Sequence, residues 1–265
     1  MKNILVPIGS NIKAAINTLQ YAVDFLQGTK ATIYVIKVYG VTKVVGSFKN
    51  IDAILEEDSN KELDEVLYEV DSKGVEIIAK SIKGNITDSI GRVAKQLEVD
   101  LIISSAKSIS TDDTVFLGKV AGGLIKHTNI PVLIIPKNYK FKNISRILMT
   151  IKSGIISSSD VILPLKNIIT KFNAELNLIR VITPDSPEED SHINEELMLL
   201  QNNFKTTENA TIFQGVLEHI HVYEPDMLCV IRRSRGFFTR LWEKDRVYKK
   251  DFESRIPLLV LKGAN

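Results

Sequence analysis

The sequence is poor in the residues that would point to several common classes of protein. Its 265 residues include one cysteine, and lysine plus arginine (34) nearly balance aspartate plus glutamate (32). A single cysteine excludes an intrachain disulfide and a cysteine-based metal site. The balanced charge gives no reason to expect a nucleic-acid or membrane partner.

Long apolar runs are also missing. The first residues, MKNILVPIGS, contain too few apolar positions in a row for the hydrophobic region of a signal peptide, and no run approaches the roughly 18 residues of a membrane helix. We therefore expect a cytoplasmic protein. The 44% apolar content is still enough to fill one large core or two ordinary ones.

A long internal repeat is present. DLIISSAKSISTDDTVFLGKVAGGLIKHTNIPVLIIP (100–136) and DMLCVIRRSRGFFTRLWEKDRVYKKDFESRIPLLVLK (226–262) both open with Asp before an apolar run, and a Pro begins a second apolar run. ILVPI (4–8) has a counterpart in ILMTI (147–151). Positions 4 and 147 are 143 residues apart, whereas 100 and 226 are 126 apart. Two diverged tandem domains explain this pattern better than a solenoid.

In each copy, short β-rich runs alternate with longer segments of helical period. The expected strands are Asn3–Ile8, Ala31–Tyr39, Val75–Ile82, Leu101–Ser104 and Pro131–Pro136, then Ile147–Ile151, Ala174–Ile182, Ala210–Phe213, Asp226–Ile231 and Pro257–Leu261. Continuous apolar strands that alternate with helices predict an α/β fold with parallel sheets covered on both faces.

The sequence also predicts the positions of two helices and of the linker between the domains. Apolar residues recur at helical spacing from Ile51 to Val70, with Gly74 as the expected C-cap, and a short helix is expected at Val216–Tyr223. The stretch KNYKFKNIS is polar and basic. We predict domains at residues 1–137 and 146–265, joined by a linker at 138–145.

Two units of this size, beginning with ILVPI and ending with IPVLIIP, resemble a tandem member of the universal stress protein family. The resemblance covers nearly the whole chain. It implies two five-stranded parallel sheets of strand order 3-2-1-4-5, in adenine-nucleotide-hydrolase-like domains. It also implies that Pro131–Ile135 and Pro257–Leu261 pair within the chain as a pseudo-dimer, which would cover two open sheet edges. Further association into a homodimer stays open.

The resemblance also indicates where a nucleotide would bind. In the ATP-binding members, a glycine, two residues, a second glycine, nine residues, a third glycine and a Ser or Thr follow the fourth strand, and an Asp follows the first strand. In the first copy these positions are Ser105, Ser108, Gly118 and Lys119, with Gly9 in place of the Asp. Only the third glycine remains, and a side chain at a glycine position obstructs close approach of backbone to phosphate.

The candidate nucleotide or anion cleft of the first copy comprises Gly9, Val38, Ser105, Lys107, Ser108, Gly118 and Lys119. The corresponding phosphate-loop positions of the second copy are Ile231, Ser234, Lys244 and Asp245, with Lys152 in place of the Asp and with Phe237, Phe238 and Trp242 nearby. No glycine of the pattern remains there, and Asp245 would repel phosphate.

We therefore expect a non-enzymatic protein of the universal-stress type that has no cofactor and has largely lost its nucleotide sites. It would be a stress-response accessory that acts through contacts with an unidentified protein partner. The alternative is a sensor of ATP or AMP, or a slow ATPase, that uses the first domain. A third interpretation places another small anion or an apolar ligand in the same cleft. We expect no metal site, because His219 and His221 lack a third ligand nearby.

The basic and aromatic segment 232–250 has several interpretations. Phe238 and Trp242 are four residues apart, which is typical of one buried helix face. A protein-binding surface, a lipid surface and a single-stranded nucleic-acid surface are the alternatives.

Overall fold

The structure is a computed structural model, and it describes residues 1–40, 51–107, 114–156, 158–184, 186, 193–232, 247–249 and 252–263. The first half contains β1 (Asn3–Ile8), α1 (Ile12–Leu26), β2 (Thr32–Tyr39), α2 (Ile51–Glu69), β3 (Glu76–Lys83), α3 (Ile86–Gln96), β4 (Leu101–Ser105), β5 (Val115–Leu117), α4 (Lys119–His127) and β6 (Val132–Ile135). The second half contains β7 (Arg146–Ile151), the 3-10 turn η1 (Ser159–Val161), α5 (Leu163–Phe172), β8 (Glu175–Ile182), α6 (Glu195–Leu200), β9 (Asn203–Glu208), α7 (Ile212–Tyr223), β10 (Met227–Arg232), β11 (Val247–Tyr248) and β12 (Leu258–Lys262).

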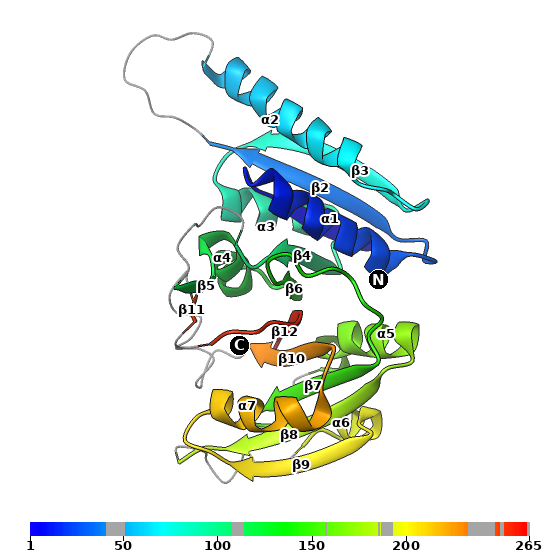
Figure 1. Cartoon of the computed structure of the whole chain (residues 1–265), viewed down its shortest axis with the longest axis vertical. Helices are drawn as coiled ribbons and strands as arrows, with labels where there is room; N and C mark the ends of the chain where they lie inside the picture. The colour runs from blue at the N-terminus through cyan, green and yellow to red at the C-terminus, as the bar shows by residue number, and fades with distance from the viewer. Residues whose placement is uncertain are drawn as a thin grey trace.

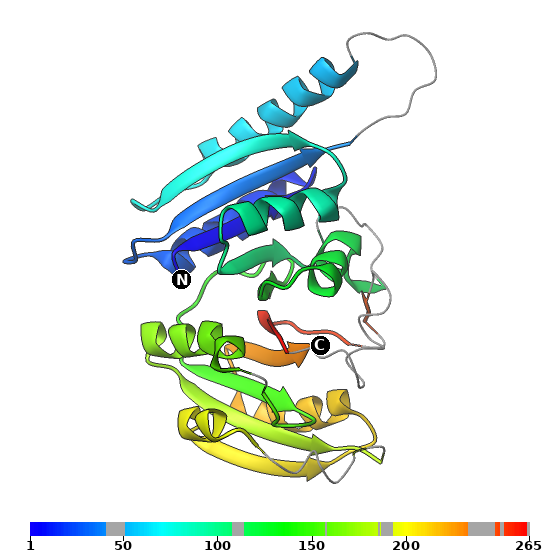
Figure 2. The same ribbon diagram turned by 180° about the vertical axis from the view of Figure 1, so that it is seen from behind.

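Ten of the described strands form one sheet in the order β3-β2-β1-β4-β6-β12-β10-β7-β8-β9. It runs along the length of the molecule, with β3 near one end and β9 near the other (Figures 1 and 2). Strands are parallel within each half, which confirms the predicted α/β class.

The two halves meet where β6 and β12 pair antiparallel, with Leu259 opposite Leu133 at the centre. A second junction joins β5 to β11 in a small antiparallel sheet. Both junctions lie within the chain, so neither half leaves its last strand as an open edge.

Helices cover both faces of the large sheet. One apolar core lies under α1, α2, α5 and α6, and we call this side the α1 face. The other core lies under α3, α4 and α7, and we call this side the α3 face. Each core contains residues of both halves, including Leu133 and Leu259 on the α1 face and Ile134 and Leu258 on the α3 face. The central strands read as continuous apolar runs because both of their faces are buried.

The repeated Asp has a structural role in each half. The Asp226 carboxylate accepts hydrogen bonds from the backbone N–H groups of Ser145 (2.8 Å) and Arg146 (2.9 Å), at the start of β7. Asp100 accepts from the backbone N–H groups of Lys2 and Asn3 at the start of β1. The Asp therefore fixes the first strand of its half to the fourth.

The prolines of the repeat also have matching partners. The carbonyl oxygen of Pro131 accepts a hydrogen bond from the N–H of Ile102, and that of Pro257 accepts from the N–H of Leu228, both at 2.9 Å. These contacts set the register between the fourth and last strands of each half. The construction of the sheet thus explains why Asp and Pro recur.

One predicted strand is wrong. Residues 210–213 were expected to be a strand, but the strand of this region is β9 (Asn203–Glu208) and α7 begins at Ile212. The Thr211 hydroxyl caps α7 by accepting a hydrogen bond from the Gln214 N–H. The polar edge strand NFKTTE has no apolar alternation, so the pattern that identifies strands was absent.

Two helix ends also differ from the prediction. Helix α7 is longer than expected because it starts four residues before Val216. Helix α2 ends at Glu69, so Gly74 is not its C-cap and instead has a φ of +78° in the turn before β3. Only glycine adopts that backbone conformation without strain.

The segment predicted as a linker, residues 138–145, contains no helix or strand and packs into the α1 face. The Phe141 ring lies 5.4 Å from the Tyr21 ring of α1 and 5.8 Å from the Phe172 ring of α5, centroid to centroid. Tyr139 also contacts Tyr21. Aromatic contacts therefore hold the connection against one helix from each half.

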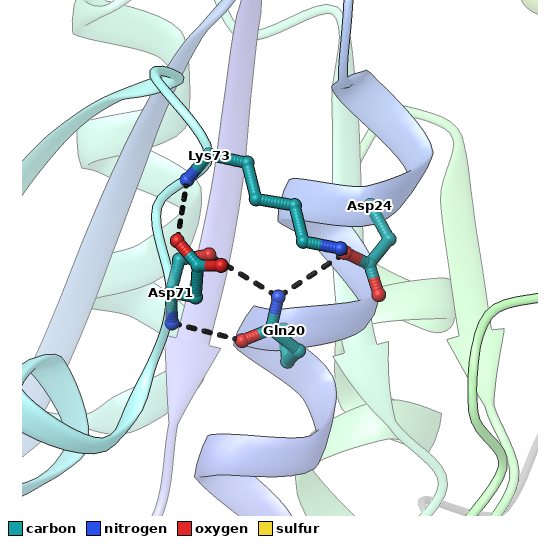
Figure 3. Close-up of polar contacts among 4 residues, drawn as sticks. All are labelled: Gln20, Asp24, Asp71 and Lys73. Carbon is teal, nitrogen blue, oxygen red and sulfur yellow. Dashed lines mark hydrogen bonds and ion pairs between the residues drawn. The ribbon is translucent and has the colours of Figure 1, made fainter.

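A polar network ties the turn between α2 and β3 to α1 (Figure 3). The Gln20 side chain accepts a hydrogen bond from the Asp71 N–H (3.0 Å) and donates to the Asp71 carbonyl (3.2 Å) and to Asp24. The Lys73 ammonium lies 2.7 Å from the Asp24 carboxylate.

None of the described helices has the length and apolar character needed to cross a bilayer.

Candidate functional site

The candidate site lies at the carboxyl ends of the parallel strands of the first half. The sheet order reverses between β1 and β4, because β2 and β3 lie on one side of β1 whereas β4 and β6 lie on the other. Helix α1 covers one face at this point and α3 the other. In open α/β sheets, ligands bind in the crevice formed at such a reversal.

A small cleft of about 50 Å³ occupies this position. It is lined by Pro7, Ile8, Gly9, Ser10, Lys37, Val38, Ile86, Ile90 and Val120. Most of these side chains are apolar, and Gly9 contributes no side chain. A volume of this size holds on the order of four water molecules.

Two of the predicted site residues, Gly9 and Val38, line the cleft. Gly9 directly follows β1, and Val38 is the penultimate residue of β2. The remaining described candidates, Ser105, Lys107 and Gly118 among them, do not line this cleft. They lie at the end of β4 and the start of α4, on the other side of the reversal.

The start of α4 keeps some features of an anion site. Gly118 is buried at the N-cap, with a φ of −71° and no side-chain cap. Its N–H donates to the Ala106 carbonyl at 2.8 Å. Helix N-termini favour anions because their first N–H groups lack helical partners. Lys119 is exposed, Ser105 and Lys107 are half-buried, and Ser108 lies outside the described residues.

The Gly118 position does not itself require glycine. A Cβ added there would lie 3.6 Å from the Ala106 carbonyl oxygen and 3.7 Å from the Lys107 Cα, which are ordinary contacts. A larger side chain would therefore obstruct a ligand at the helix start without an unavoidable clash in the fold.

The sequence prediction missed the apolar helix residues of the cleft, Ile86, Ile90 and Val120. Their signal was the ordinary apolar spacing of a core helix, so nothing marked them as cleft residues. It also missed Lys37, which is 5% exposed and forms an ion pair with Glu62 of α2. A lone lysine within the apolar strand TIYVIKVY was a usable signal, since buried lysines need a partner.

In the second half, helix α7 packs closely on β8, the strand next to β7. The register between β7 and β8 matches the register between β1 and β2, so Val181 occupies in β8 the position that Val38 occupies in β2. Val181 is fully buried, whereas Val38 is partly exposed. A Cβ on Gly215 of α7 would lie 2.6 Å from a Val181 methyl carbon, so the helix backbone sits directly on this strand.

The segment that follows β7 also lies close to another part of the second half. A Cβ on Gly154 would lie 2.5 Å from the Cα of Ile193, and the Gly154 carbonyl accepts a hydrogen bond from the Asn194 N–H at 3.0 Å. Lys152 and Ile231 lie at the ends of β7 and β10. The other second-copy positions, Ser234, Phe237, Phe238, Trp242, Lys244 and Asp245, lie outside the described residues.

The described residues contain no group of three or more His, Cys, Asp and Glu residues able to hold a metal ion. Cys229 is fully buried, and burial raises the pKa of its thiol, so it is a poor nucleophile. His219 is 6% exposed on the inner side of α7, and within the described structure its Nε2 has no hydrogen-bond partner. Burial lowers its pKa, and Lys205 lowers it further.

Comparison with known proteins gives a family match for the first half and structural matches for the whole chain. The model of the universal stress protein family matches residues 1–136. A universal stress protein structure from Archaeoglobus fulgidus has a TM-score of 0.72 at 18% sequence identity, covering 99% of this chain and 97% of that one. A putative universal stress protein from Pseudomonas aeruginosa has a TM-score of 0.61 at 15% identity, covering 99% and 94%. No curated protein matches the sequence.

Proposed function

The chain belongs to the universal stress protein family, and we propose that it is a non-enzymatic member that has largely lost its nucleotide sites and acts through contacts with protein partners. One observation carries this proposal. Neither half presents a carboxylate where the adenosine end of a nucleotide would be held, because Gly9 occupies that position in the first half and Lys152 in the second.

The state of the two crevices supports the same conclusion. The first-half cleft is small and mostly apolar. In the second half, α7 lies close to Val181 at Gly215, and the chain after β7 lies close to Ile193 at Gly154, so a nucleotide bound at these strand ends would have less room.

The described side chains are consistent with a non-enzymatic role. The one cysteine is inaccessible, and the described residues contain no metal-binding cluster. Contacts with other proteins would use the outer surface of the helices, where Tyr68 on α2 is 88% exposed and Leu199 on α6 is 86% exposed. Large exposed apolar side chains are common in protein interfaces.

Titration calorimetry with ATP, ADP and AMP tests the proposal. We expect no heat of binding at micromolar concentrations of any of the three nucleotides. Micromolar binding of AMP, whose recognition needs the adenosine end, would refute it.

A second function is favoured by a specific observation. Gly9 and Val38 line a cleft at the reversal of the sheet, and the uncapped start of α4 lies on the other side of the same reversal. This arrangement supports a sensor of ATP or AMP, or a slow ATPase, in the first half. It predicts a rise in melting temperature with nucleotide that Gly118→Val abolishes. The absence of any rise in the wild type would eliminate it.

A further inference from the structure

His219 is a buried imidazole without a hydrogen-bond partner, and it lies where helix α7 meets the sheet. The residue is 6% exposed, and within the described part of the chain its Nε2 atom has no hydrogen-bond partner. Its ring lies edge-on to that of Tyr223, one turn further along α7, with 6.3 Å between the centroids. Burying a charge without a partner is costly, so the docked helix requires the neutral imidazole.

The first half shows that the fold does not need a histidine at this place. Helix α3 lies between β3 and β4, as α7 lies between β9 and β10, and both helices cover the α3 face. Their N-caps are Asn85 and Thr211. Val93 lies eight residues after Asn85, and His219 lies eight residues after Thr211. Val93 packs against the core as an apolar residue, so the titratable group is specific to the second half.

A cation on the neighbouring strand also opposes protonation of His219. Ile179 belongs to the core of the α3 face, and Lys205 lies opposite it in the register of β8 and β9. Opposite residues of neighbouring strands share a face, so Lys205 is on the side that α7 covers. Burial lowers the His219 pKa most, Lys205 lowers it further, and Glu218 of α7 partly offsets them.

The other charged residues that the strands under α7 place on the α3 face lie at the strand starts. Alternation along β7 and β8 assigns Arg146 and Glu175 to this face, each as the first residue of its strand. Arg146 forms an ion pair with Glu224, the C-cap of α7. Neither of them shifts the His219 pKa noticeably, so Lys205 and Glu218 are the charges that matter.

Helix α7 is the only described helix of the second half on the α3 face. It lies on one side of β7 and β8, with α5 and α6 on the other (Figures 1 and 2). Beneath it, Ile179 and Val181 are fully buried. Release of α7 would therefore uncover apolar strand residues while the α1 face stays covered.

We propose that α7 is an acid-released cover of the α3 face in the second half: protonated His219 is a buried cation near Lys205, and the helix separates from β7 and β8 to hydrate it. In the released helix, His219 has its ordinary pKa of about 6.5. Its pKa is lower in the docked helix, so docking is complete above about pH 6.5 and weakens as the pH falls, by up to about tenfold per pH unit. The inference does not rest on the proposed function.

Thiol labelling of the full chain tests the release. Val216→Cys places a thiol on the buried side of α7, whereas the native Cys229 lies in the core of the α1 face. The reagent is dithiodipyridine, which also reacts with thiols in mild acid. Between about pH 7.5 and about pH 5.5, the labelling rate of Val216→Cys, divided by that of the same variant with His219→Val, should rise by up to about tenfold. Cys229 of the wild type should stay unreacted.

Two further variants sharpen the test. His221→Val is the matched control, because His221 is exposed on the same helix, and it should leave the rise unchanged. Lys205→Gln should reduce the rise, since the cation no longer opposes protonation. If Val216→Cys does not fold, Ile220→Cys on the same side of α7 replaces it.

Three results would overturn the inference. They are a rate ratio that does not change with pH, a rise that His221→Val removes, and labelling of Cys229 in parallel with Val216→Cys, which would mean that the whole half unfolds. None of these results bears on nucleotide binding, so the proposed function would stand or fall by its own titration.

Discussion

Replacing Gly215 with alanine tests whether α7 rests directly on β8. In a helix interior, Gly→Ala ordinarily stabilises by about 1 kcal/mol because alanine loses less backbone entropy on folding. Here the added Cβ would lie 2.6 Å and 3.0 Å from the two methyl carbons of Val181, which is fully buried. Overpacking of this kind costs about 1 to 3 kcal/mol. The clash outweighs the propensity gain, so we expect net destabilisation of about 1 kcal/mol.

Gly91→Ala is the matched control, because Gly91 lies inside α3 and an added Cβ there would meet nothing within 4 Å. It should stabilise by about 1 kcal/mol. The same substitution is thus expected to change the urea midpoint in opposite directions in the two helices.

A rescue experiment identifies the clash itself. In a Val181→Ala background the two methyl groups are gone, so Gly215→Ala should stabilise rather than destabilise, and the double-mutant cycle should show the coupling. If Gly215→Ala alone stabilises as much as Gly91→Ala, α7 does not rest on Val181 of β8.

Two further predictions concern a buried imidazole and the connection between the halves. His219 has a pKa below its ordinary value in the folded chain, so its stabilising contribution is complete above about pH 6.5, where the unfolded group is neutral, and is lost as the pH falls below that value. His219→Val should flatten the dependence of urea stability on pH between neutral and mildly acidic conditions; an unchanged slope would contradict this account. Phe141→Ala removes the aromatic contact between α1, the connecting segment and α5, and should destabilise by about 2 kcal/mol, since the ring is only partly buried. A change below about 0.5 kcal/mol, as at an ordinary surface position, would mean that residues 138–145 are a free linker.

The family and the mostly parallel α/β fold could be predicted because short apolar strands that alternate with helical segments are visible in the local sequence. Central strands such as Ile147–Ile151 are apolar on both faces, and that pattern is visible without knowing the partner strands. The edge strand β9 was missed for the same reason: one of its sides is open, so NFKTTE needs no apolar pattern. Residues 210–213 were instead assigned to a strand because Thr211 was not recognised as the cap of α7.

The candidate site was only partly predictable. Gly9 and Val38 line the cleft because they end neighbouring strands, and strand order follows from the family resemblance. The packing of α3 and α4 brings Ile86, Ile90 and Val120 to the cleft. The spacing of apolar residues does not by itself predict how two helices pack.

The sequence alone indicates that two similar α/β units follow one another, and that they differ at the positions where the family resemblance predicts nucleotide binding. The tertiary structure was needed to show that α7 rests on Val181, that the connecting segment packs between α1 and α5, and that Lys152, Arg232 and Lys262 lie at the ends of adjacent strands. These three residues are separated by 80 and 30 positions along the chain, at 152, 232 and 262. Strand register brings them together, and register depends on hydrogen bonds between segments that are distant in the sequence.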